Sequence, residues 1–124
     1  MTTILAIGLD PISADLAAFP QFTPEMLRSY IDGELDRVRA AGFEVVSCLI
    51  DGGDTAAAVV ADTLRSRRFD CVVIGAGLRL PPEQLVLFET VVNLVHRLAP
   101  DCRIAFNSRP ADTLDAVRRA LNVP

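Results

Sequence analysis

The chain has 124 residues, of which 51% are hydrophobic and 23% are charged, and this composition is typical of one folded domain. Its formal net charge is −4, and its basic residues other than one histidine are all arginines, because the sequence contains no lysine. Nucleic-acid affinity depends on clustered basic side chains that contact phosphates, so this charge argues against a nucleic-acid partner.

Four short apolar runs have the length and the β-branched content of buried strands. They are residues 3–9, 44–50, 71–76 and 103–107. The first and third runs lack an alternation of apolar and polar residues. Such continuous apolar runs are typical of strands that helices cover on both faces of a parallel sheet.

Segments with helical periodicity follow each of these runs. Residues that favour a helix start stand at the beginning of each segment. From the first helix to the fourth, these are Thr23 with Pro24, Asp54, Pro82, and Ser108 or Arg109 with Pro110. The third helix is expected to extend from Pro82 to Leu98.

Strict alternation of strands and helices predicts parallel strands joined by right-handed crossovers. With four such units, the economical arrangement covers both faces of the sheet and reverses direction once. We therefore expect a single three-layer α/β domain over residues 1–124, with a four-stranded parallel sheet in the order 2-1-3-4. This architecture is flavodoxin-like, or more broadly Rossmann-like.

Ligands of open α/β sheets bind outside the carboxyl ends of the strands, at the point where the strand order reverses. In the order 2-1-3-4, this crevice lies between the first and third strands. Glycines let the backbone approach a ligand, Asp10 is a possible acceptor, and Arg79 has the forked donors that suit an anion. The residues expected to bind a small metabolite or anion there are Gly8, Asp10, Gly75, Gly77, Arg79, Asn107 and Ser108.

The glycines after the third strand do not match a nucleotide-binding motif. Residues 75–79 read G-A-G-L-R, which is neither the dinucleotide fingerprint nor the P-loop. Pro81 and Pro82 lack the N–H groups of a phosphate nest, and Glu83 would repel an anion. Glycines that serve only a sharp turn and close helix packing are therefore the alternative interpretation, and no cofactor is expected.

The connection from Asp10 to Thr23 is about fourteen residues long, which is unusual for the loop between a strand and a helix. Phe19 and Phe22 make it partly apolar. Such a segment is either a lid, a binding loop or an interface arm, or a packed surface loop. The sequence leaves both interpretations open.

A comparison with receiver domains removes one possible activity. Receivers carry a phosphoryl-accepting aspartate at the end of the third strand and a lysine on a later strand, whereas this chain has Gly75 at the first position and no lysine. Phosphotransfer by that route is therefore excluded. A receiver-like adaptor without phosphotransfer is still an alternative.

The third helix carries more apolar residues than one sheet face needs. The surplus predicts that a neighbouring helix or a second copy of the chain covers it, and we expect a homodimer through Leu87, Val91 and Leu94. The single histidine, His96, lies at the margin of the apolar face near the end of this helix. We interpret it as a hydrogen-bonded boundary residue.

The three cysteines are an odd number and show no C-x-x-C or Cys/His spacing, so no metal site is expected. The N-terminus lacks the basic and apolar regions of a signal peptide. No apolar run approaches the ~20 residues of a membrane span. These features predict a cytoplasmic protein with reduced thiols and no membrane partner.

Four segments together resemble a group of small uncharacterised bacterial proteins with a flavodoxin-like, receiver-like fold. They are residues 7–11 (IGLDP), 72–79 (VVIGAGLR), 87–96 (LFETVVNLVH) and 106–113 (FNSRPADT). The resemblance covers most of the chain and implies a cytoplasmic bacterial protein. It implies no activity and no catalytic residue.

Three functional hypotheses follow in order of preference. The first is a module that binds a small metabolite or anion in the crevice above the first and third strands. The second is a structural or regulatory adaptor that acts through the third helix. The third is a small hydrolase or transferase that uses Asp10, and it ranks last because no second titratable group is reliably placed beside Asp10.

Overall fold

The computed structural model describes residues 1–17 and 19–124 and contains one parallel sheet of four strands in the order β2-β1-β3-β4. The predicted fold class and strand order are therefore confirmed, and the topology is flavodoxin-like. The strands are β1 (Thr3–Leu9), β2 (Glu44–Ile50), β3 (Cys71–Ile74) and β4 (Arg103–Phe106).

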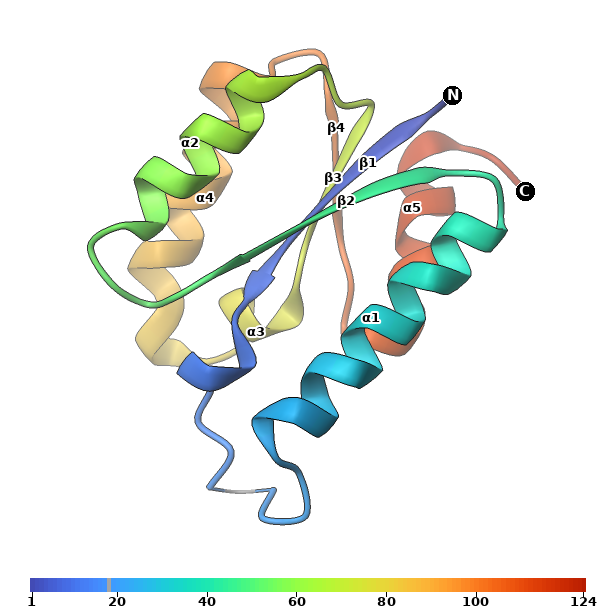
Figure 1. Ribbon diagram of the computed structural model, residues 1–124. Coiled ribbons are helices and arrows are strands. Elements are labelled where there is room, and N and C mark those ends of the chain that lie inside the picture. The colour runs from blue at the N-terminus through green and yellow to red at the C-terminus, as the bar shows by residue number, and fades with distance from the viewer. Residues whose placement is uncertain (18) are drawn as a thin grey trace.

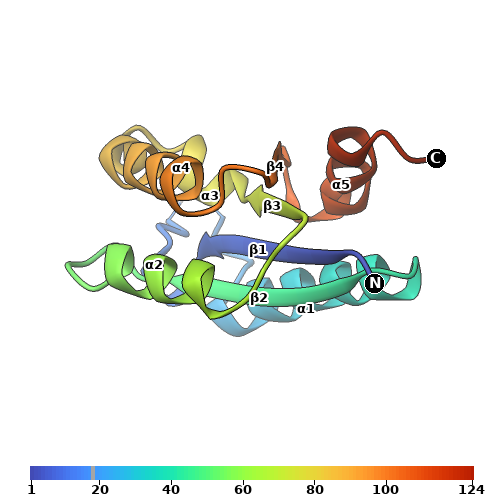
Figure 2. The same ribbon diagram turned by 90° about the horizontal axis from the view of Figure 1, so that it is seen from above.

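Helices cover both faces of this sheet, as Figures 1 and 2 show. α1 and α5 lie on one face, and α2 and α4 lie on the other. The α-helices are α1 (Pro24–Ala40), α2 (Ala56–Ser66), α3 (Ala76–Arg79), α4 (Leu85–Leu98) and α5 (Thr113–Leu121). Short 3₁₀ turns are η1 (Pro11–Ser13), η2 (Pro82–Gln84) and η3 (Pro110–Asp112).

The two faces of the sheet have separate apolar cores because successive strand side chains point in opposite directions. Leu5 and Ile7 of β1 pack with α2 and α4, whereas Ile4 packs with α1 and α5. All four residues of β3 are buried. This double coverage explains why β1 and β3 read as continuous apolar runs in the sequence.

The start of α1 follows its sequence signals. The Thr23 hydroxyl accepts the N–H of Met26 at 3.1 Å, and Pro24 occupies the first turn. The expected cap of α2 is wrong, because Thr55 occupies the N-cap position there without a side-chain bond. Asp54 precedes that position by one residue.

The segment after β3 differs from the expected long helix. β3 ends at Ile74, and α3 follows as a single turn closed by the N–H of Leu80 on the carbonyl of Ala76 at 2.8 Å. The residue before a proline is restricted to extended backbone, and Pro81 has a ψ of 126° before Pro82. This restriction separates α3 from η2. The helical segment therefore begins at Pro82, as a 3₁₀ turn, and becomes α-helical at Leu85.

In the part of the chain that the structure describes, no helix is both long enough and apolar enough to cross a membrane.

Candidate functional site: a cleft at the carboxyl ends of β1 and β3

The tips of β1 and β3 are direct neighbours. Ile7 is paired with Ile74, and the N–H of Gly75 continues the ladder to the carbonyl of Ile7 at 2.9 Å. A Cβ atom built on Gly75 would lie only 3.6 Å from the Cα of Gly8. The two glycine-bearing ends therefore meet, as the predicted strand order requires.

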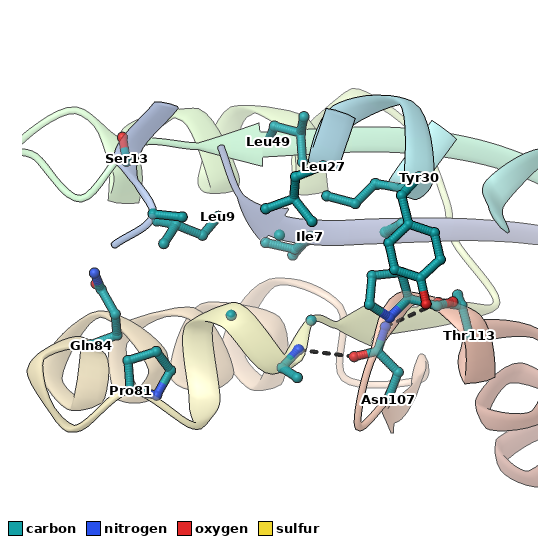
Figure 3. A pocket seen from close by; sticks show the side chains of 18 of the residues that line it. Ile7, Leu9, Ser13, Leu27, Tyr30, Leu49, Pro81, Gln84, Asn107 and Thr113 are labelled. Atoms are coloured by element: carbon teal, nitrogen blue, oxygen red, sulfur yellow. Dashed lines mark hydrogen bonds between the residues drawn. The ribbon is translucent and has the colours of Figure 1, made fainter. Parts of the chain in front are cut away.

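A cleft of about 650 Å³ opens beside these tips (Figure 3). Most of its lining residues are apolar, and they come from the strand ends, from α1, from the segment after β1, and from the turns before α4 and α5. Among the predicted site residues, those that line it are Gly8, Gly75, Gly77 and Asn107.

α1 provides one wall of the cleft. Leu27 and Ile31 lie on the face of α1 that is turned toward the sheet, one helical turn apart, and they are only partly buried. Leu49 and Leu9 lie near this wall, and Pro81 and Gln84 lie across the opening (Figure 3). The cleft thus separates the β1–β2–α1 half of the molecule from the turn before α4.

The long segment after β1 borders the same cleft. Leu16, Phe19 and Phe22 line it, and the ring centroids of the two phenylalanines are 6.5 Å apart. Phe19 is 53% exposed and Phe22 is 38% exposed. Since these rings are half open to solvent and the space beside them remains, they border the cleft without filling it.

Asn107 is a buried polar residue at the edge of the cleft, and its side chain joins two segments of the chain. Its Oδ1 atom accepts the N–H of Ala76 at 2.9 Å, and its Nδ2 atom donates to the Thr113 hydroxyl at 3.0 Å. The Thr113 hydroxyl in turn donates to the carbonyl of Pro110 at 2.7 Å. Asn107 therefore fixes the turn after β3 against the start of α5, which makes it a positioning residue.

The side chains of the other three predicted site residues make contacts within the protein, and none of them lines the cleft. The Asp10 carboxylate accepts the N–H of Ile12 at 3.1 Å and caps η1. The Ser108 hydroxyl donates to the Asp112 carboxylate. Burial raises the pKa of Asp112, but hydrogen bonds from Ser108 and Arg109 outweigh it and hold the pKa below its usual value.

Arg79 contacts residues 106 and 107 and does not line the cleft. One terminal nitrogen, Nη2, donates to the carbonyl of Asn107 at 2.8 Å, and the guanidinium lies 6.0 Å from the centre of the Phe106 ring. Phe106 also packs against Phe88 of α4. These contacts join α3, β4 and α4, so Arg79 has a structural role in holding these three elements together.

Tyr30 is a lining residue that the sequence analysis did not identify. It projects from α1 toward Asn107 and Thr113 (Figure 3). Its phenolic oxygen accepts the N–H of Ala111 at 3.2 Å. The sequence does hold a signal for this residue. Tyr30 lies three residues after Leu27 and one before Ile31, so it lies beside the apolar face that these two residues form on α1.

The charged residues that line the cleft are both acidic. Asp15 lies in the segment after β1, where its carboxylate accepts the N–H of Ala17 at 3.0 Å, and Glu83 lies in η2. Both residues are exposed. Among the described residues that line the cleft there is no arginine.

The cysteines and the histidine lie outside this cleft. Burial and the neighbouring Cys102 raise the pKa of the Cys71 thiol to about 12, and burial raises the pKa of Cys102 to about 11. His96 is exposed near the C-terminal end of α4. Within the described ranges no group of three metal-binding side chains occurs.

The apolar surplus of α4 is largely used within the chain. Val91 and Leu94 are buried in the core that α4 shares with α2, and Leu87 is partly buried against it. The exposed apolar residues of α4 are instead Leu85 and Val86, which are 61% and 74% exposed. Homodimer formation stays a prediction, with Leu87 as the predicted contact that retains exposed surface.

A comparison of the chain with protein-family models finds no match. A comparison with curated proteins finds no relative either.

Proposed function

We propose that the protein is a binding module that takes a small molecule into the cleft above β1 and β3. The observation that carries this proposal is the cleft itself, of about 650 Å³, at the place where ligands of open α/β sheets bind. Sites for small molecules are largely apolar concavities of ~300–1,000 Å³ with a few fixed polar groups. The lining described above has that character.

The segment from Asp10 to Thr23 completes the site in this proposal. Its two ends are fixed, because the N–H of Asp10 donates to the carbonyl of Ile50 at 2.8 Å and Thr23 caps α1. Between these points, Leu16, Phe19 and Phe22 border the cleft. A bound molecule would gain apolar contact from this segment and would shield its half-exposed rings.

The test is a matched pair of glycine variants in a thermal-shift screen of metabolites. A Cβ atom at Gly8 would meet Leu49 at an ordinary 3.5 Å, so the position tolerates a side chain, and Gly8→Leu is expected to fold and to occupy the part of the cleft beside the strand tips. Gly33→Leu is the control, because a Cβ atom on this exposed α1 glycine meets nothing within 4 Å. Compounds that stabilise the wild type and Gly33→Leu but not Gly8→Leu support the proposal. Compounds that stabilise all three equally contradict it.

The second candidate function is an adaptor that acts through α4. Leu85 and Val86, the first two residues of α4, are both exposed apolar side chains. Exposed apolar surface of this kind favours a protein contact. The hydrolase hypothesis gains no such support, because the Asp10 carboxylate serves as a structural cap.

A further inference from the structure

We propose that the ligand of this cleft is an uncharged molecule with a ring-bearing apolar body and a hydrogen-bond acceptor such as a carbonyl oxygen, which Tyr30 recognises. This inference rests on the proposed function, since it names the chemical class of molecule that the same cleft takes. It replaces the anion that Arg79 suggested in the sequence.

The walls favour an apolar body. Leu27 and Ile31 of α1 face the strand ends, and Phe19 and Phe22 border the same space from the segment after β1. Pro81 contributes a further ring from across the opening (Figure 3). Flat apolar rings pack well against aromatic and proline side chains, so a ring system buries more surface here than a solvated polar body would.

The charges disfavour an anion. Arg79, the nearest arginine in the sequence to the glycine tip, donates to the carbonyl of Asn107 and does not line the cleft. The charged lining residues, Asp15 and Glu83, would repel a negative group. A desolvated charge without a counter-ion is costly, and among the described lining residues no cationic side chain offers one to an anion.

The same arrangement disfavours a cation inside the cleft. Asp15 and Glu83 are exposed, so they attract a positive group only in the well-solvated opening, where such pairs contribute little. The lining at the strand ends, which includes Gly8, Gly75 and Ala6, carries no carboxylate. A positive charge drawn inward would therefore lose its hydration without gaining a counter-ion.

Tyr30 supplies the polar recognition. A phenolic hydroxyl both donates and accepts, and in Tyr30 the acceptor role is taken by the N–H of Ala111. In the described part of the chain, no acceptor takes the hydroxyl hydrogen of Tyr30. This donor lines the cleft and suits a ligand oxygen with a free lone pair. Asn107, in contrast, already uses both ends of its amide.

The experiment uses four probes that share one ring system and differ in one group. They are 2-acetylnaphthalene (neutral acceptor), 2-methylnaphthalene (neutral, no acceptor), 2-naphthoate (anion) and 2-naphthylmethylammonium (cation). Affinities are measured by titration calorimetry on the full chain. We expect the neutral ketone to bind at least about tenfold more tightly than either charged probe. Equal or tighter binding of the anion or of the cation would overturn the assignment of charge, and so would a failure of both neutral probes to bind.

The role of Tyr30 is tested with Tyr30→Phe against the two neutral probes. Loss of one hydrogen bond is expected to weaken 2-acetylnaphthalene about fivefold to tenfold. The affinity of 2-methylnaphthalene is expected to stay unchanged, which a merely structural effect of the variant would not allow. Equal weakening of both probes, or of neither, would contradict recognition by Tyr30.

Failure of the proposed ligand class is distinguishable from failure of the proposed binding function. A charged metabolite that stabilises the wild type and Gly33→Leu but not Gly8→Leu would keep the cleft as the site and would refute the ligand class alone. If no compound shows that pattern in the metabolite screen and no naphthalene probe binds, both proposals fail.

Discussion

The side-chain oxygen of Asn107 accepts the backbone N–H of Ala76 at 2.9 Å, across 31 positions of the sequence. This bond joins the end of β4 to the turn after β3, and the amide nitrogen of the same side chain continues it to Thr113 in α5. Gly75 and Gly77, which line the cleft, therefore lie in a turn that is fixed by the residue directly after β4.

The first prediction concerns the hydrogen bonds of the Asn107 side chain. Asn107→Ala should lower the free energy of unfolding by about 1–3 kcal/mol, because it leaves the Ala76 N–H without its partner in a partly buried turn. Chemical denaturation measures the change. Asn93→Ala is the control. Asn93 is exposed on α4, where its side-chain amide donates to the carbonyl of Glu89, and the effect of this variant should stay within about 0.5 kcal/mol. Equal effects of the two variants would contradict the positioning role of Asn107.

The second prediction separates a supporting role of Arg79 from a ligand-binding role. Arg79→Ala removes the bond to the Asn107 carbonyl and the packing against Phe106, so it should destabilise the protein by about 1–2 kcal/mol. Ligands found in the thermal-shift screen should still stabilise this variant by the same increment as the wild type. An unchanged melting temperature combined with lost ligand stabilisation would show instead that Arg79 binds the ligand.

Some features of this site could be predicted from the sequence, and others could not. The strand order was predictable, because doubly buried strands and alternating helices leave few arrangements. Glycines at the tips of β1 and β3 followed from that order. The direction of the Arg79 side chain was not predictable, since it depends on a carbonyl 28 positions away in sequence.

The residues of α1 show why the wall of the cleft could not be predicted from the sequence. One apolar stripe contains Leu27, Ile31, Leu35 and Val38, yet only its later part is fully buried. The first turns of α1 lie beside the ends of the strands, where the stripe lines a cleft instead of the core. Helical periodicity gives the direction of such a stripe but not the point at which the sheet beneath it ends. Tyr30 was missed for the same reason.

The third prediction is a pH dependence at the start of α5. The folded pKa of Asp112 is lowered, so its ionised form contributes stability above its usual value of about 3.9, and this contribution is lost as the pH falls below that value. Asp112→Asn should therefore lower the melting temperature at pH 7, and the difference from the wild type should shrink between about pH 5 and pH 3. Asp101→Asn, an exposed position near the other end of β4, is the control. A difference that stays constant over this range would refute the linkage.

The fourth prediction concerns thiol reactivity. The pKa of Cys71 is about 12 and that of Cys102 about 11, and burial also raises the pKa of Cys48. Thiolates react and thiols do not, so iodoacetamide at pH 8 should modify the native protein slowly and the denatured protein at all three cysteines. Intact-mass measurement over time gives both rates. Native protein that is modified as rapidly as denatured protein would contradict the raised pKa values of these thiols.

The fifth prediction addresses the homodimer. If the start of α4 forms the contact, light scattering should give a dimer at micromolar concentration, and Val86→Glu should give a monomer. Val59→Glu, at an exposed position of α2, should leave the dimer intact. A monomeric wild type would end the dimer hypothesis, and a dimer that survives Val86→Glu would move the contact elsewhere.

The central claim is that small molecules bind beside the glycine-bearing tips of β1 and β3. Backbone amide NMR of the ¹⁵N-labelled chain, titrated with the compound that stabilises it most, tests this claim directly. We predict the largest shifts at the amides of Gly8, Gly75 and Gly77, with little change at Gly33 and Gly42, which do not line the cleft. Shifts confined to Gly33 and Gly42, or to the exposed face of α4, would contradict it.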